Sequence, residues 1–193
     1  MRVLSCMFVR LFMLALLGTA LASAGSVFTI DNAVGAGSVS GTIQTDGTIG
    51  TLSAADILDW NLLLNNGSST FTLLGPLSGN NSQLDAFGSD LSATATQLLF
   101  DFTDLSTSGF YLFQNPTIGS GMNYFCMETY TGCTGAPAGE SLLISAGGGS
   151  QYTALSGTVV IGTLAIPEPT TLGLVGLGAV ILIARRKNHR VRS

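Results

Sequence analysis

The chain has 193 residues and a formal net charge of −4, with 46% hydrophobic and only 9% charged residues. All its Lys and Arg lie at or before Arg10 or at or after Arg185, while ten of its 11 acidic residues fall between Asp31 and Glu140. Because nucleic acids and anionic lipid surfaces are bound through basic side chains, the central part of the chain is expected to bind no nucleic acid and no anionic lipid.

Residues 1–24 have the three parts of a secretory signal peptide. Arg2 and Arg10 supply a basic start, an apolar run follows, and Ala22 and Ala24 form the small-x-small pattern that signal peptidase requires. We expect cleavage directly after Ala24, so that the rest of the chain is exported.

Residues 25–165 are expected to form one all-β domain. Apolar and polar residues alternate, or β-branched and aromatic residues gather, in segments separated by Gly, Asn or Pro. These segments are 38–44, 58–64, 69–74, 91–102, 110–114, 123–127, 141–145 and 152–164. About seven to nine strands at this spacing are typical of an antiparallel β-sandwich, here expected to be jelly-roll-like.

Three short motifs predict the local connections in the first half of this domain. Asp46-Gly47 is a hairpin turn signal, and Asn-Asn-Gly at 65–67 predicts the turn of a second hairpin. Ser-Ala-Ala-Asp at 53–56 resembles a capping box, which predicts a single helical turn between strands.

Cys126 and Cys133 are the cysteines that follow the signal peptide. In the oxidising envelope, two cysteines with six residues between them most simply close a disulfide-bonded loop, stabilising the fold by about 2–3 kcal/mol. A metal or redox pair is the alternative, but no histidine or second cysteine pair stands nearby and the spacing is not Cys-x-x-Cys. We therefore expect a disulfide, no metal site and no cofactor.

The residue types of the domain argue against catalysis. The sole histidine is His189, and no Lys or Arg lies between Leu11 and Ala184, so a serine or cysteine nucleophile has no base there. Carboxylate pairs of the glycosidase type are the remaining enzymatic possibility, and calcium ligation is a further one. The candidate pairs are Asp101 with Asp104, Asp56 with Asp59, and Glu128 with Glu140. We expect these acids to be solvated surface groups and the protein not to be an enzyme.

The C-terminal segment, residues 166–193, has an uncharged stretch followed by a basic tail, as a membrane anchor does. Uncharged residues 170–184 predict a single transmembrane helix, and the basic tail 185–193 predicts that its C-terminal side stays in the cytoplasm. The basic cluster of this tail comprises Arg185, Arg186, Lys187 and Arg190. The expected precursor therefore crosses the inner membrane once.

A proline–acid–proline triplet stands directly before this span, as Pro167, Glu168 and Pro169. Residues 166–190 resemble the PEP-CTERM sorting signal of Gram-negative bacteria, in which this triplet, a short glycine-rich helix and an arginine cluster occur in the same order. The resemblance implies recognition by exosortase at or near the triplet, removal of the tail, and delivery of the domain to the cell surface or an exopolysaccharide matrix. The two prolines keep the peptide extended before the helix.

Two functions remain open for the exported domain. The first is a non-catalytic structural or interaction role in the envelope. The second is a carbohydrate-binding module associated with exopolysaccharide, in which aromatic faces stack on sugars. The candidate aromatics are Trp60, Tyr111, Tyr124 and Tyr130. Because Trp60 shares a period-two face with Leu58, Leu62 and Leu64, we expect it to lie in the core.

Overall fold

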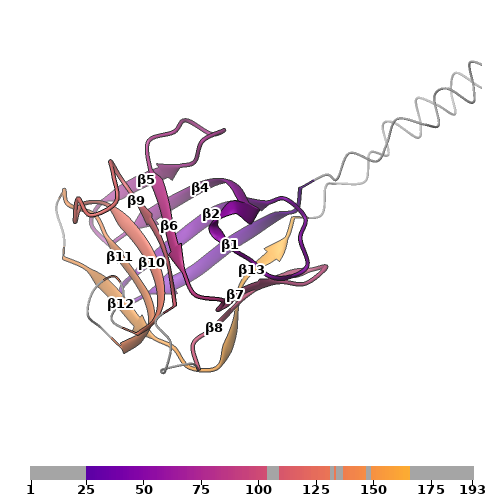
Figure 1. Ribbon diagram of the computed structural model, residues 1–193. Coiled ribbons are helices and arrows are strands. Elements are labelled where there is room, and N and C mark those ends of the chain that lie inside the picture. Colours follow the sequence, from indigo (N-terminus) through magenta and orange to yellow (C-terminus); the bar gives the residue numbers. More distant parts are fainter. Residues whose placement is uncertain (1–24, 104–108, 131–132, 134–136, 147–148, 166–193) are drawn as a thin grey trace, which may run out of the picture.

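The computed structural model describes residues 25–103, 109–130, 133, 137–146 and 149–165. These residues form thirteen β-strands and one short 3-10 turn, and every strand pairing is antiparallel. The strands make two sheets that enclose a common core (Figure 1). The all-β prediction is confirmed, but the predicted number of seven to nine strands is too low. The two sheets together also have more strands than the eight of a jelly roll.

The larger sheet has eight strands in the order β3-β7-β8-β13-β1-β2-β4-β5. Their bounds are β1 Val27–Val34, β2 Gly37–Thr45, β3 Gly50–Thr51, β4 Ile57–Asn65, β5 Thr70–Leu74, β7 Leu91–Ala93, β8 Gln97–Asp101 and β13 Thr158–Leu164. The smaller sheet has the order β12-β11-β10-β9-β6. Its strands are β6 Gln83–Phe87, β9 Phe110–Gln114, β10 Tyr124–Tyr130, β11 Pro137–Leu143 and β12 Gln151–Ala154.

The tip of the β1–β2 hairpin connects the larger sheet to the β12 edge of the smaller sheet. Gly35 has φ +59°, a conformation that glycine adopts without steric cost. The Gly35 N–H donates to Oγ1 of Thr153 at 2.7 Å, and the Ala36 N–H donates to Oε1 of Gln151 at 2.9 Å. Both acceptors lie on β12, so the turn of the larger sheet is fixed to the edge strand of the smaller one.

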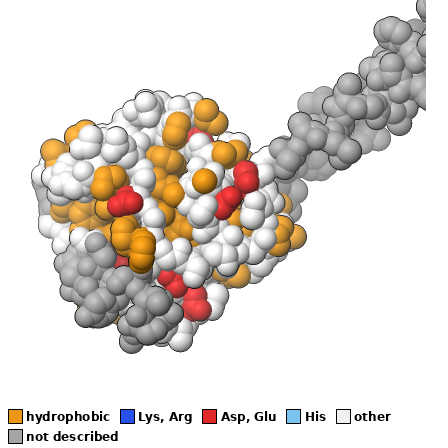
Figure 2. Space-filling model, in the orientation of Figure 1, with side chains coloured by type: hydrophobic (Ala, Val, Ile, Leu, Met, Phe, Trp, Pro, Cys, Tyr) orange, Lys and Arg blue, Asp and Glu red, His pale blue; other side chains and the backbone are white. Residues whose placement is uncertain are grey.

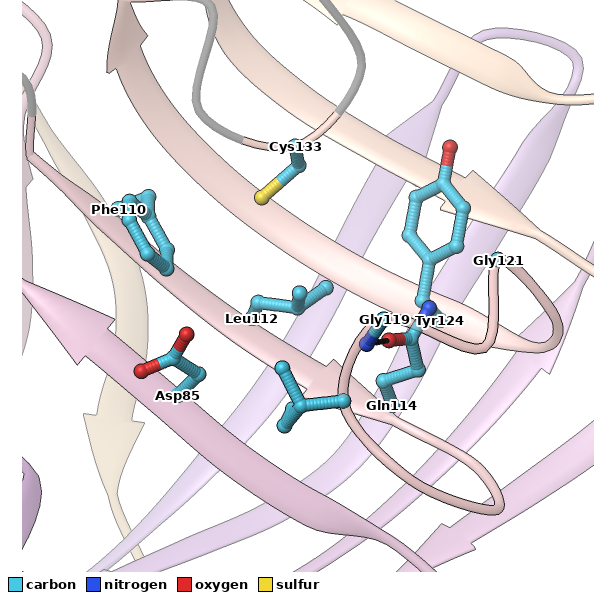
Figure 3. Close-up of a pocket in the computed structure, with 9 residues that line it drawn as sticks. Asp85, Phe110, Leu112, Gln114, Gly119, Gly121, Tyr124 and Cys133 are labelled. Carbon is cyan, nitrogen blue, oxygen red and sulfur yellow. Dashed lines mark hydrogen bonds between the residues drawn. The ribbon is translucent and has the colours of Figure 1, made fainter.

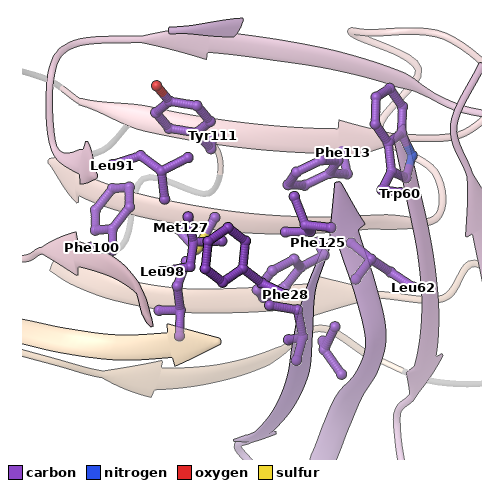
Figure 4. Close-up of a cluster of buried hydrophobic side chains, with 14 of the residues drawn as sticks. Phe28, Trp60, Leu62, Leu91, Leu98, Phe100, Tyr111, Phe113, Phe125 and Met127 are labelled. Carbon is purple, nitrogen blue, oxygen red and sulfur yellow. The ribbon is translucent and has the colours of Figure 1, made fainter. Parts of the chain in front are cut away.

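Aromatic and aliphatic side chains from both sheets fill the core, as Figure 4 shows. Trp60 is 4% exposed and packs edge to face on Phe113, with ring centroids 5.2 Å apart. Its indole N–H donates to Oγ of Ser82 at 2.8 Å, which satisfies the buried donor. The prediction that Trp60 lies in the core is confirmed.

The prediction for Leu58 is wrong, because this side chain is 39% exposed. The pairing of β2 with β4 passes from Gln44↔Asp59 to Thr45↔Ile57, so Leu58 is an extra residue on its strand. Such a bulge shifts the alternation by one position. Ile57 therefore enters the core in place of Leu58.

The turn predictions had different outcomes. The 65–67 turn is confirmed, since β4 and β5 pair from Asn65↔Thr70 onward and Gly67 has φ +89°. The 3-10 turn Ala54–Asp56 is also confirmed, and the backbone N–H and the hydroxyl of Ser53 both donate to the Asp56 carboxylate. Asp46-Gly47 does not close a hairpin, because β2 pairs with β1 and β4 and the chain after it crosses to β3 at the edge of the sheet.

The structure also divides or adds strands relative to the prediction. Segment 91–102 is split by a turn in which the N–H of Gln97 donates to Oγ1 of Thr94 at 2.9 Å. Segment 152–164 is split between the two sheets. Strands β1, β3 and β6 were not predicted, although β1 alternates Phe28 and Ile30 with polar residues.

Within the described part of the chain, no helix has the length and apolar character needed to cross a membrane. The transmembrane helix predicted at 170–184 lies outside the described residues. Figure 2 shows acidic side chains scattered among apolar and polar ones, with no lysine or arginine on the described part of this face.

Candidate functional site

The outer face of the five-stranded sheet carries side chains in three rows that run across the strands. Side chains alternate between the two faces of a strand, so opposite partners in register share one face. The rows are Gln83–Gln114–Tyr124–Leu143, Asp85–Leu112–Cys126–Ser141–Tyr152 and Phe87–Phe110–Glu128–Gly139–Ala154. Polar and aromatic residues from five strands between Gln83 and Ala154 therefore meet on this face.

A disulfide bond holds a loop end over the middle of this face. Cys126 and Cys133 are bonded, which confirms the predicted pair. The Cys133 N–H donates to Oε2 of Glu128 at 2.6 Å, and Glu128 is fully buried. Glu128 is thus a structural acceptor that receives the backbone of the disulfide loop.

Cys126, Glu128 and Cys133 also place their possible ligand atoms within 4.8 Å of one another. Metal ions bind cysteine as the thiolate, and the two sulfurs here are joined to each other. The oxidised group therefore offers a single carboxylate, which is too few ligands for a structural metal site.

A hollow of about 360 Å³ lies beside the disulfide, over β6 and β9. Figure 3 shows Phe110 and Leu112 at its base, Asp85 along one side and Cys133 on the opposite side. The loop between β9 and β10 forms a further side with Ile118, Gly119 and Gly121. The hollow thus combines apolar, amide and carboxylate groups.

Two glutamine side chains hold the loop beside the hollow in place. The Gly119 N–H donates to Oε1 of Gln114 at 2.6 Å, and the Ile118 N–H donates to Oε1 of Gln83 at 3.2 Å. Gln114 is only 3% exposed. Since each glutamine carbonyl is directed to the loop backbone, this side of the hollow is preformed.

An aromatic pair continues the hollow toward the edge of the sheet. Phe87 and Phe110 are cross-strand partners whose rings stack with centroids 6.4 Å apart and an interplanar angle of 27°. Phe87 is 62% exposed. Sequence reasoning missed Phe87, because the short segment 83–87 was not identified as a strand.

The aromatic residues proposed for sugar stacking do not form an exposed platform. Trp60, Tyr111 and Tyr124 are 4%, 1% and 8% exposed. Burial raises the pKa of Tyr111 to about 12, and burial followed by the nearby charge of Glu128 raises the pKa of Tyr124. The stacking alternative is therefore wrong for Tyr111 and Tyr124, since a stacking face must reach solvent, while the burial of Trp60 agrees with its predicted place in the core. The side chain of Tyr130 lies outside the described residues.

The candidate carboxylate pairs either lie on opposite faces of a sheet or accept hydrogen bonds that stabilise turns and loops. Glu128 lies on the outer face of the smaller sheet, whereas Glu140 pairs with Met127 and faces the core. Asp56 caps the 3-10 turn, which lowers its pKa through hydrogen bonds from Ser53.

The remaining predicted acids also have backbone partners or lie outside the described residues. Asp59 accepts hydrogen bonds from the N–H groups of Leu77 and Ser78. Asp101 accepts one from the N–H of Thr103 at 2.9 Å, and Asp104 lies outside the described residues.

One carboxylate is buried between the two sheets, so the expectation of solvated surface acids is wrong for Glu140, as it is for the buried Glu128 and Asp59. Glu140 is 3% exposed, and its Oε1 accepts a hydrogen bond from Nδ2 of Asn32 at 2.7 Å. Burial raises the pKa of Glu140 to about 7, and the Asn32 hydrogen bond opposes this rise. The pair connects β11 with β1 across the sandwich.

The other predicted site residues lie outside the described residues. These are the cleavage-site residues Ala22 and Ala24, the triplet Pro167, Glu168 and Pro169, and the basic cluster Arg185, Arg186, Lys187 and Arg190. The described strands end at Leu164, immediately before this C-terminal segment.

The fold and its outer face define an all-β sandwich with a disulfide-closed loop and a partly polar hollow. Residues 165–187 match the family model of the PEP-CTERM protein-sorting motif. The chain therefore carries this motif, which implies an exported, membrane-anchored precursor that exosortase processes and that is sorted to the cell surface. No curated protein and no solved structure matched the chain.

Proposed function

We propose that the chain is a non-catalytic structural or interaction protein of the cell envelope, whose β-sandwich is released to the surface or the extracellular matrix by exosortase. The observation that carries this proposal is the sorting motif at 165–187, which begins directly after β13. The motif and the sandwich adjoin in the chain, so cleavage at or near Pro167, Glu168 and Pro169 leaves all thirteen strands on the released product.

A non-catalytic role is supported by the side chains available to the domain. Between Leu11 and Ala184 there is no Lys, Arg or His, so proton transfer depends on carboxylates and tyrosines alone. Asp56, Asp59 and Glu128 each accept hydrogen bonds that stabilise a turn or a loop. Carboxylates with such structural partners are poorly suited to exchange protons with a substrate.

The sorting proposal is tested by mass spectrometry of the surface-exposed protein from a host that carries exosortase. We expect a mature N-terminus at Gly25 and a C-terminus at or near the triplet. Replacing Pro167, Glu168 and Pro169 with alanines is expected to leave the precursor in the inner membrane, while the control Thr158→Ala is expected to be processed normally. An intact Ser193 on the surface-exposed protein would contradict processing.

The non-catalytic role is tested separately with purified protein and a panel of glycans. We expect no hydrolysis products. Hydrolysis that disappears in Glu128→Gln or Glu140→Gln, while the exposed-site control Asp31→Asn retains it, would refute this part of the proposal.

Carbohydrate binding is the second candidate function. The hollow on the outer face of the smaller sheet favours it, because an exposed carboxylate and fixed amide groups line it and the exposed Phe87 stacks on its lining residue Phe110. Sugar-binding sites use such combinations, in which apolar faces contact C–H groups and polar groups orient the hydroxyls.

A further inference from the structure

We propose that Phe87, Phe110 and Asp85 form a binding subsite for one sugar unit of an uncharged polysaccharide. This inference rests on the second candidate function above and names its residues and the class of its ligand. The three side chains come from the paired strands β6 and β9, which present them on the same face beside the hollow.

The aromatic part of the subsite is the stacked pair Phe87–Phe110. Phe87 stands on edge strand β6 with 62% of its surface exposed, and its ring stacks on Phe110, which lines the hollow together with Leu112. The π face of a phenyl ring is electron-rich and attracts the weakly positive C–H groups on one face of a pyranose. An exposed ring at the margin of a hollow thus gains contact area when a sugar ring lies against it.

The polar part of the subsite is Asp85. Its side chain is exposed and lies along one side of the hollow, with the carboxylate turned toward Phe110, as Figure 3 shows. An ionised carboxylate has two acceptor oxygens, so it can accept hydrogen bonds from two adjacent sugar hydroxyls. Hydrogen bonds to a charged acceptor are roughly twice as strong as neutral ones.

The charge of the domain selects the kind of polysaccharide. No Lys, Arg or His lies between Leu11 and Ala184, while Asp85 stands directly beside the hollow. Carboxylated, sulfated or phosphorylated sugars would meet this negative charge without a basic partner. The ligand class that fits is therefore a neutral glycan.

The dimensions and construction of the hollow agree with one sugar unit. Its volume of about 360 Å³ lies at the lower end of small-molecule sites, which begin at roughly 300 Å³. Gln114 and Gln83 already fix the adjacent loop through Gly119 and Ile118. A ligand would then bind with little cost for ordering that loop.

The test is calorimetric titration of the purified exported protein with gluco-, galacto-, manno- and xylo-oligosaccharides, beside an oligogalacturonate as the acidic probe. We expect at least one neutral oligosaccharide to bind and the acidic probe to bind more weakly. Phe87→Ala should weaken binding roughly five-fold, and Asp85→Asn about ten-fold. Leu77→Ala and Asp31→Asn are the matched controls, because they remove an exposed apolar group and an exposed carboxylate away from the hollow.

Three results would overturn the inference. If none of the neutral probes binds at millimolar concentration, the subsite is refuted, while the sorting experiment still decides the envelope function independently. If a neutral probe binds and both hollow variants retain full affinity, carbohydrate binding stands but the assigned residues are wrong. Preference for the acidic probe would refute the charge argument.

Discussion

Replacing Glu140 with glutamine should make the protein more stable above neutral pH. The Glu140 carboxyl is buried between the sheets, and its pKa rises from 4.5 to about 7 on folding. At about 1.36 kcal/mol per pH unit, this rise corresponds to roughly 3 kcal/mol. Glutamine has nearly the same shape and retains a carbonyl oxygen that can accept the Asn32 hydrogen bond, but it carries no charge.

The direction in which stability changes with pH follows from proton binding to Glu140. Between pH 4.5 and about 7 the folded protein keeps the Glu140 proton that the unfolded chain has released, so this group's contribution to stability is complete below pH 4.5 and is lost as the pH rises through about 7. The Gln variant lacks this loss. Its advantage over the wild type should therefore grow by roughly 3 kcal/mol from pH 4 to pH 8 and then level off.

Urea unfolding of the wild type and the variant at several pH values, followed by Trp60 fluorescence, measures this difference. Asp31→Asn is the control, because it removes the same charge from an exposed position on β1, next to Asn32 in the chain. We expect the control to follow the wild type to within about 0.5 kcal/mol at every pH. A Glu140→Gln advantage that does not change between pH 4 and pH 8 would refute the assignment of a buried, neutralised carboxyl.

Two further predictions concern the covalent and electrostatic properties of the domain. The exported protein should show no free thiol before reduction and two after it, and labelling of Cys126 or Cys133 in the unreduced, folded protein would exclude the bond. Its melting temperature should rise with moderate salt or divalent cations, because ten acidic residues between Asp31 and Glu140 have no basic residue among them. A melting temperature that falls with added salt would contradict this electrostatic reasoning.

Local patterns in the sequence predicted much of the fold. The alternation from 38 to 44 and the Asn-Asn-Gly turn at 65–67 are encoded by neighbouring residues, and the structure contains both. The disulfide was predictable for the same reason, since few residues separate the two cysteines. The exposure of Leu58 was not predictable from the local sequence. It results from a bulge that shifts the inward–outward alternation of β4, and this bulge arises where β4 pairs with β2.

The candidate site depends on contacts that no local pattern contains. Asn32 and Glu140 are 108 positions apart in the chain, yet their side chains are hydrogen-bonded. Similarly, Phe87 meets Phe110 only because β6 pairs with β9. An acid or an aromatic residue in a strand-like segment can face either the core or solvent, and the pairing partner decides between them.

The position of β13 explains how the domain can lose its C-terminal tail without losing its fold. This last strand lies between β8 and β1 inside the larger sheet, so it is paired on both sides. The N–H of Leu164 donates to the carbonyl of Thr96 at 2.8 Å, and the N–H of Ala165 donates to that of Val27 at 2.7 Å. These bonds fix the end of the sandwich immediately before the sorting triplet. Cleavage at or near that triplet would therefore break a peptide bond outside the hydrogen-bonded sheet, and the released domain would keep every pairing that stabilises it.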